Sequence, residues 1–84
     1  MRFNVLYLAR LREAFGRRQE QLELPAASTV GELIDALRAR GGAWATELAA
    51  ARAVRVAVNQ EVTQLSAPLR DGDEVALFPP VTGG

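Results

Sequence analysis

The chain contains neither cysteine nor histidine among its 84 residues. Without cysteine it can form neither a disulfide framework nor a thiolate metal site. Without histidine it lacks the usual general base near neutral pH and the commonest metal ligand. Ser28 and Ser66 therefore have no histidine to activate them as nucleophiles. We do not expect an ordinary active site built from the side chains of this chain.

Lysine is absent as well, because all ten basic residues are arginines. The chain thus offers no side-chain amine for Schiff-base chemistry and could not be linked to itself through its own side chains. Ten acidic residues balance the arginines, so the formal net charge is zero. This balance argues against a broad nucleic-acid-binding surface, which requires an excess of positive charge.

Long hydrophobic runs are also missing, and no segment approaches the length of a membrane span. The apolar start of the chain is interrupted by Arg10 and Arg12, and no small-residue cleavage site comes after them. We interpret this start as a first strand rather than a signal peptide. With 49% hydrophobic residues, the chain can bury one small core. The expectation is a soluble cytoplasmic protein with one domain.

The first strand is predicted at Arg2–Leu8, with apolar residues on both faces: Phe3, Val5 and Tyr7 on one, Leu6 and Leu8 on the other. Such a strand is usually central or covered on both sides. Residues 9–16 favour a short helix that ends at Gly16. Residues 17–24 alternate as a half-exposed strand, which we expect to pair with the first strand and to end at Pro25.

The clearest helix lies in the segment Ser28–Gly42. Thr29 and Glu32 have the spacing of a capping box, and an apolar stripe comes next at Val30, Leu33, Ile34 and Leu37. Arg38 and Arg40 are placed in its last turn, and Gly41-Gly42 ends it. Residues 43–52 are ambiguous between a short helix and a turn, and we expect Trp44 there to be partly buried against the sheet or helix.

Three further extended segments are predicted after residue 52. Residues 53–58 form a strand, Asn59–Glu61 a hairpin tip, and residues 62–69 a short, weak strand. The final strand is Glu74–Phe78, after a turn at Asp71–Asp73. The acidic turn resembles the start of a calcium loop, but Thr82 stands where the bidentate glutamate is needed, so this match fails.

This order predicts an α+β fold, a mixed sheet of four to five strands with one main helix packed across it and short extra helices. The first and last strands are the natural central pair, and they run parallel if adjacent. Residues 1–78 form the domain, and residues 79–84 form an extended tail.

The tail is the strongest functional signal in the sequence. Pro79 and Pro80 end the last strand and stiffen the segment after it. Val81–Gly84 can span roughly 13 Å when extended. Because Gly83 and Gly84 lack a Cβ, they can enter a channel too narrow for side chains. ATP can activate the Gly84 carboxylate as an acyl-adenylate for transfer to sulfur or an amine. The alternative is a frayed terminus with two accidental glycines.

The run PLRDGDEVALFPPVTGG at residues 68–84 resembles the C-terminal signature of the small subunit of molybdopterin synthase, a family of ubiquitin-like sulfur carriers. FNVLYLARLREAFG, STVGELIDALRARG and VAVNQE are similar to the same family, so the likeness extends over essentially the whole chain. The resemblance implies a β-grasp fold. It also implies that Gly84 is adenylated, becomes a thiocarboxylate and donates its sulfur to cyclic pyranopterin monophosphate, making the molybdopterin dithiolene.

The same resemblance implies the partners and the contact residues. The partners are the large synthase subunit, an E1-like adenylating enzyme and a sulfur donor system, with two small and two large subunits in the working complex. The chain alone is non-catalytic and holds no permanent cofactor; ATP is used by the activating partner. Pro79, Pro80, Val81, Thr82 and Gly83 thread into the partner, and the docking residues are Leu8, Arg12, Val62 and Phe78.

Three alternatives remain open at this point. A thiamine-type sulfur carrier would use the same chemistry on another acceptor. A ubiquitin-like protein modifier would form isopeptide bonds through Gly84, an alternative that the lack of lysine weakens without excluding. A structural β-grasp module would keep its function without Gly83 and Gly84.

Overall fold

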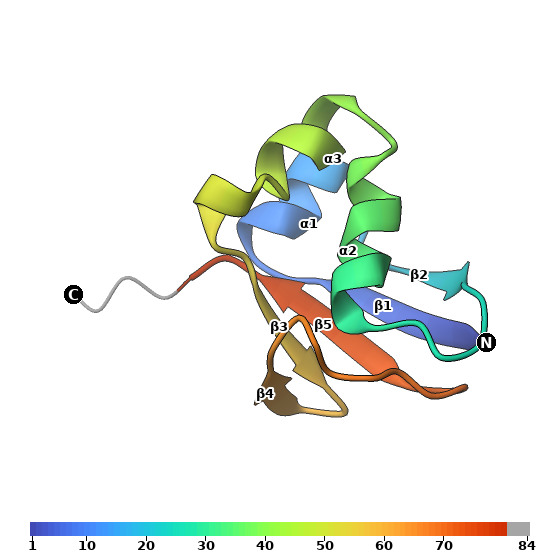
Figure 1. Ribbon diagram of the computed structural model, residues 1–84. Coiled ribbons are helices and arrows are strands. Elements are labelled where there is room, and N and C mark those ends of the chain that lie inside the picture. Colours follow the sequence, from blue (N-terminus) through green and yellow to red (C-terminus); the bar gives the residue numbers. More distant parts are fainter. Residues whose placement is uncertain (81–84) are drawn as a thin grey trace.

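The computed structural model describes residues 1–80, and the chain forms one five-stranded sheet with all the helices of these residues on one face (Figure 1). The strand order is β2-β1-β5-β3-β4. The elements are β1 (Arg2–Tyr7), α1 (Arg10–Phe15), β2 (Gln19–Glu23), α2 (Val30–Arg38), α3 (Gly42–Glu47), the 3-10 helix η1 (Ala50–Arg52), β3 (Arg55–Val58), β4 (Glu61–Thr63) and β5 (Glu74–Phe78). The predicted mixed sheet with one main helix and short extra helices is confirmed.

The first and last strands form the centre of the sheet. β1 and β5 pair in parallel, with Val5 opposite Val75 and Tyr7 opposite Leu77. The other three strand pairs are antiparallel. Because β1 and β5 are parallel, the carboxyl end of β5 lies beside the carboxyl end of β1. The chain therefore leaves the sheet next to α1, which comes directly after β1.

Helix α2 forms where the capping box was predicted. The Thr29 hydroxyl accepts a hydrogen bond from the Glu32 amide at 3.3 Å, and the Glu32 carboxylate accepts one from the Thr29 amide at 3.0 Å. The predicted stripe of Val30, Leu33, Ile34 and Leu37 is buried. The helix is thus capped at its start and packed against the sheet by its apolar side.

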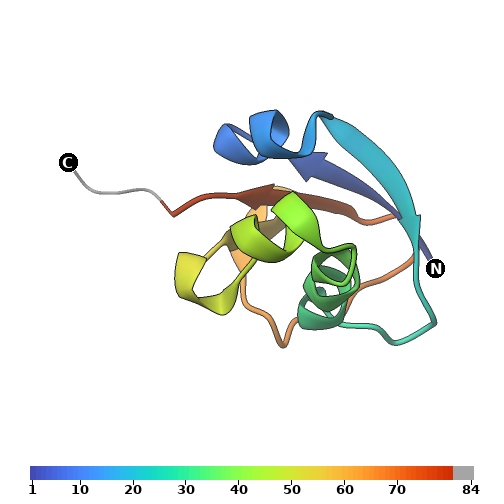
Figure 2. The ribbon, with the colours of Figure 1, turned by 90° about the horizontal axis from the view of Figure 1, so that it is seen from above.

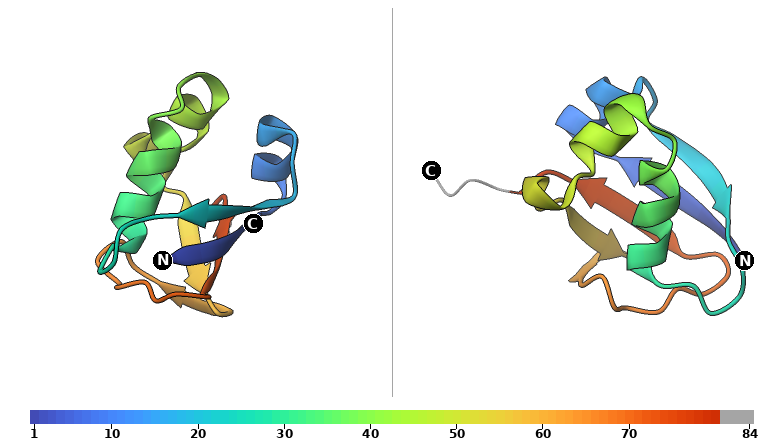
Figure 3. Two further views of the ribbon diagram at one scale, coloured as in Figure 1. Left: turned by 90° about the vertical axis from the view of Figure 1, so that its right-hand side faces the viewer. Right: turned by 45° about the horizontal axis from the view of Figure 1, so that its top comes forward.

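The two views in Figure 3 show the helices standing over one face of the sheet, and the buried core residues come from these helices and from the strands. On the sheet side, the core consists of alternating side chains of the two central strands: Phe3, Val5, Tyr7, Val75 and Leu77. On the helix side, the core consists of Leu11 and Phe15 of α1 and the apolar stripe of α2. The opposite face of the sheet has no helix over it within residues 1–80.

The β3–β4 hairpin turns without glycine. Asn59 and Gln60 have φ values of 51° and 72°, the left-handed values that a two-residue turn of this kind requires. Asn59 is held in place because its side-chain oxygen accepts from the Glu74 amide at 3.1 Å and its side-chain nitrogen donates to Asp73 at 2.9 Å. Hydrogen bonds to the start of β5 thus fix the strained turn.

Several details of the sequence prediction were wrong. The weak strand expected at residues 62–69 is only Glu61–Thr63, so Glu61 belongs to β4 and not to the hairpin tip. β1 ends at Tyr7, so Leu8 lies just beyond the strand. α2 ends at Arg38, and Arg40 lies beyond its last turn, where its guanidinium binds Glu20. Gly42 does not end α2 but begins α3, which occupies the ambiguous segment together with η1. The predicted partial burial of Trp44 is confirmed.

Candidate functional site

The last described residues of the chain are the two prolines directly after β5. Pro79 is half-buried and Pro80 is exposed. The predicted site residue Gly84 and the predicted threading residues Val81, Thr82 and Gly83 lie outside the described residues. The described part of the site therefore consists of the surfaces around the point where β5 leaves the sheet.

The open face of the sheet carries an apolar row across four strands. Leu6 lies opposite Ala76, Ala76 opposite Ala57, and Ala57 opposite Val62. Because paired residues point to the same side of a sheet, these four side chains share the open face. The two alanines are nearly buried by their neighbours, whereas Val62 is 61% exposed. The row makes a shallow apolar surface without a covering element in residues 1–80.

Two more predicted docking residues extend this surface toward the tail. Phe78, half-buried, alternates with Ala76 and lies opposite Arg55 of β3. Leu8 is 44% exposed and lies just after β1, where its amide donates to the Leu77 carbonyl at 3.1 Å. We call the six residues Leu6, Leu8, Ala57, Val62, Ala76 and Phe78 the open-face patch.

Arginines border the open-face patch. Arg12 and Arg18 line a cleft of about 460 Å³ together with Leu6, Tyr7, Leu8 and Gln19. Neither arginine forms an ion pair with an acidic residue in the part of the chain that the structure describes. Of the four predicted docking residues, Leu8 and Arg12 line this cleft, whereas Phe78 and Val62 lie farther along the open face of the sheet.

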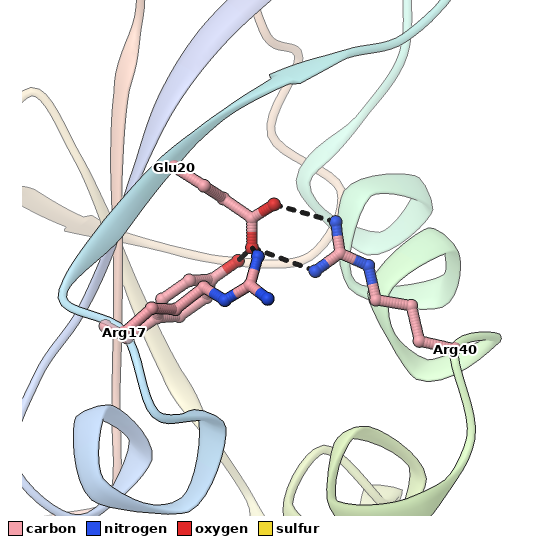
Figure 4. A network of polar contacts seen from close by, with 4 residues as sticks. Arg17, Glu20 and Arg40 are labelled. Carbon is pink, nitrogen blue, oxygen red and sulfur yellow. Dashed lines mark hydrogen bonds and ion pairs between the residues drawn. The ribbon is translucent and has the colours of Figure 1, made fainter.

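A separate network lies on the helix side of the sheet (Figure 4). Arg40 donates two hydrogen bonds to the Glu20 carboxylate, at 2.8 and 2.9 Å, and Arg17 lies 3.3 Å from it. The Tyr7 hydroxyl donates to the same carboxylate at 2.6 Å. The Arg40 hydrogen bonds, aided by the Tyr7 hydrogen bond and the charge of Arg17, lower the pKa of Glu20 from 4.5 to about 2. Burial and the Glu20 hydrogen bond raise the pKa of Tyr7.

This network continues into α3 through Trp44. Trp44 stacks on Phe15 with ring centroids 3.8 Å apart and planes 9° from parallel. The Arg40 guanidinium lies 4.5 Å from the centroid of the Trp44 ring, at a distance where the ring face attracts a cation. Since these groups are all engaged with one another, we assign the network a structural role rather than a catalytic one.

Metal and membrane sites are not found in the described part of the chain. Among residues 1–80, no three His, Cys, Asp or Glu side chains are grouped so that they could hold a metal ion. The helices of these residues are all too short to span a membrane.

Comparison with known proteins decides the family. Residues 5–84 match the ThiS family. This chain belongs to the ThiS family. The molybdopterin synthase sulfur carrier subunit of Haemophilus influenzae is 41% identical over 81 residues, covering 96% of this chain and 98% of that protein. The corresponding Escherichia coli subunit is 42% identical, covering 95% of this chain and 96% of that protein.

The fold of the ThiS family chain is shared with solved structures. SAMP1 from Haloferax volcanii superposes with a TM-score of 0.79 and 29% identity, and the match covers 100% of both chains. The resemblance to molybdopterin synthase small subunits that the sequence showed is thus confirmed, as is the ubiquitin-like β-grasp fold.

Sequence reasoning missed part of the site in this ThiS family member. Leu6, Ala57 and Ala76 belong to the open-face patch but were not predicted as docking residues, although the alternation in the first strand had already placed Leu6 on its second apolar face. The ion pair of Arg10 with Glu47, beside Pro79, had no signal in the sequence, because the two residues are 37 positions apart.

Proposed function

We propose that this chain is the sulfur carrier subunit of a molybdopterin synthase, with Gly84 as the residue that carries the sulfur. One observation supports this most strongly: the central strand β5 runs along the open-face patch, and its carboxyl end leads directly into Pro79 and Pro80. A partner that docks on the patch therefore receives the tail beside its own binding surface. The names of the 41–42% identical relatives supply the pathway.

The chemistry of the proposal takes place at the main-chain terminus. An E1-like enzyme transfers AMP from ATP to the Gly84 carboxylate and releases pyrophosphate. A sulfur donor system then replaces AMP with sulfur and leaves a thiocarboxylate. In the large subunit, the thiocarboxylate gives this sulfur to cyclic pyranopterin monophosphate, and hydrolysis returns the carboxylate. Two such transfers complete one dithiolene. The absence of Cys, His and Lys agrees with this division of labour.

In this proposal, residues 1–80 bind the partner protein and set the direction in which the tail leaves the domain. The open-face patch buries apolar area against the large subunit or the adenylating enzyme, and Arg12 contacts an acidic group at its border. Pro79 and Pro80 hold the chain extended, so that Val81, Thr82 and Gly83 thread into the partner. ATP and sulfur are substrate and cargo, and the proposal assigns no resident cofactor to the chain. It places the complex in the cytoplasm.

The second candidate is a ubiquitin-like protein modifier. SAMP1, the structural relative, is named a small archaeal modifier protein. The higher identity of the curated sulfur carrier subunits favours the sulfur carrier, and it also disfavours a thiamine-type carrier.

Reconstitution tests the proposal. The chain, the adenylating enzyme, ATP, a sulfur donor and the large subunit are combined with cyclic pyranopterin monophosphate. We expect dithiolene formation that requires every component and is lost when Gly84 is deleted. Dithiolene formation by the Gly84-deleted chain at the native rate would contradict the proposal.

A further inference from the structure

Where the chain leaves the sheet, it borders a groove that three other segments line with it. Pro79 and Pro80 form one wall of a cleft of about 190 Å³ whose other walls are Arg10, Leu11, Glu47, Arg52 and Val54. Seen from above, the end of β5 passes between α1 and η1 (Figure 2). Pro79 is half-buried there, whereas Pro80 is exposed. Among residues 1–80, Pro79 is thus the last one that is partly buried against the domain.

An ion pair forms one wall of this groove. Arg10 donates from Nε to one Glu47 oxygen at 2.9 Å and from Nη2 to the other at 3.3 Å. Arg10 is the first residue of α1 and Glu47 the last of α3, so the two-bond contact joins two helices. Two parallel hydrogen bonds fix orientation as well as distance.

The two partners of the pair differ in exposure. The Glu47 side chain is only 11% exposed, whereas that of Arg10 is 61% exposed. A carboxylate shielded in this way requires a hydrogen-bonded cation, and the hydrogen bond from Arg10 lowers the pKa of Glu47. Arg52, a further wall of the groove, adds a second positive charge that acts on Glu47. Two arginines, Arg10 and Arg52, therefore lie near Glu47, close to the end of β5.

We propose that Arg10 and Glu47 are positioning residues for sulfur transfer: their ion pair fixes the groove that seats Pro79 and so sets the direction in which the tail leaves. The inference rests on the proposed function and deepens it. A diproline transmits direction because each ring fixes its φ near −65°. Once Pro79 is seated, the stiff segment points the tail toward the partner. This lowers the entropy lost when Gly84 enters the partner's site.

The test separates tail direction from docking and from folding. Glu47→Gln and Arg10→Gln each remove one charge of the pair and keep a polar side chain in its place. Both variants are converted to the thiocarboxylate, and kcat and KM for the carrier are measured with the large subunit. We expect kcat to fall roughly tenfold at unchanged KM, because the open-face patch is untouched. The exchange variant Arg10→Glu/Glu47→Arg should restore part of kcat, because the ion pair re-forms while Arg52 then faces a like charge at position 47.

Arg2→Gln is the matched control. It breaks another ion pair between two elements, Arg2 with Glu23, at the opposite end of β1. Its kcat should equal that of the native chain. Melting temperatures are recorded for every variant, and nuclear Overhauser contacts from Pro79 to Leu11 and Val54 report on the groove. These contacts should weaken in both single variants and return in the exchange variant.

Two results would overturn the inference. One is native kcat in both single variants. The other is a rise in KM alone, which would place the pair in docking. If the native chain transfers no sulfur, the proposed function fails instead, and the Pro79 contacts in the variants still test the groove on their own.

Discussion

Phe78, the last residue of β5, lies opposite Arg55 of β3 on the uncovered face of the sheet, one residue before the diproline. The aromatic side chain of Phe78, the cationic side chain of Arg55 and the first residue after β5, Pro79, are therefore neighbours. This adjacency links docking on the open-face patch to delivery of the tail, and substitutions on the patch and in the tail can separate the two.

The open-face patch should bind the partner, and Val62 provides the cleanest test. Val62→Asp places a charge in the patch at a side chain that is 61% exposed, so the fold should tolerate it. We expect affinity for the large subunit to fall at least about tenfold, measured by calorimetry, because the new carboxylate is desolvated on binding.

Leu65→Asp is the control for this change. Leu65 is similarly exposed, at 56%, but lies beside Gly31 of α2 on the helix side. The affinity of the Leu65→Asp variant for the large subunit should match that of the native chain. Equal losses in the two variants, or none in either, would show that the open face is not the docking surface.

Phe78→Asp should weaken partner binding more than folding. Phe78 is only half-buried and is not part of the hydrophobic core. Titration with the large subunit and thermal unfolding are compared for this variant. Outright unfolding, or native affinity in a folded variant, would argue against an interface role.

Deletion of Gly84, or extension beyond it, should abolish sulfur transfer and leave the fold intact. The buried hydrophobic core ends at Leu77, well before the terminus. We expect the unfolding free energy to change by less than about 0.5 kcal/mol, as for surface changes. A large drop in melting temperature would show that the terminus contributes to the fold.

Acid should destabilise the protein partly through Glu20. Its pKa is lowered from 4.5 to about 2, so its contribution is complete above pH 4.5 and is lost as the pH falls toward 2. The groups facing it are Tyr7, Arg17 and Arg40. Thermal unfolding of Glu20→Gln should show a flatter pH dependence across this window than the native chain, with a lower melting temperature at pH 7. Parallel profiles would contradict the assignment.

The capping box should stabilise α2 measurably. Thr29→Ala removes the hydroxyl that accepts from the Glu32 amide, and we expect a loss of about 1 kcal/mol in urea unfolding. Thr46→Ala, at an exposed position inside α3, is the control and should cost much less. Equal effects would mean that the cap contributes nothing specific.

The fold was predictable because local patterns and the tertiary structure agree. The alternation in β1 and β5, the capping box at Thr29 and the stripe of α2 each specify one element, and the observed sheet order brings the two most apolar strands together at its centre. Gly42 was misassigned because consecutive glycines usually end a helix, whereas here tertiary contacts of Trp44 with Phe15 hold a new helix directly after Gly41.

The candidate site was predictable only in part. Leu8, Arg12, Val62 and Phe78 were placed by family resemblance; the structure puts Val62 and Phe78 on the open face and Leu8 and Arg12 in the cleft that borders it. The groove around Pro79 could not be predicted, because Arg10, Glu47 and Val54 meet only through the packing of α1, α3 and the segment after η1. Local sequence patterns carry no information on such distant ion pairs.

The intact mass of the untagged protein, purified from the cells that make it, shows directly whether Gly84 carries sulfur. We predict a species in which one oxygen is replaced by sulfur, localised by fragmentation to Gly84. An unmodified carboxylate, with Gly84 instead joined to lysines of other proteins, would contradict the sulfur carrier and identify the chain as a protein modifier.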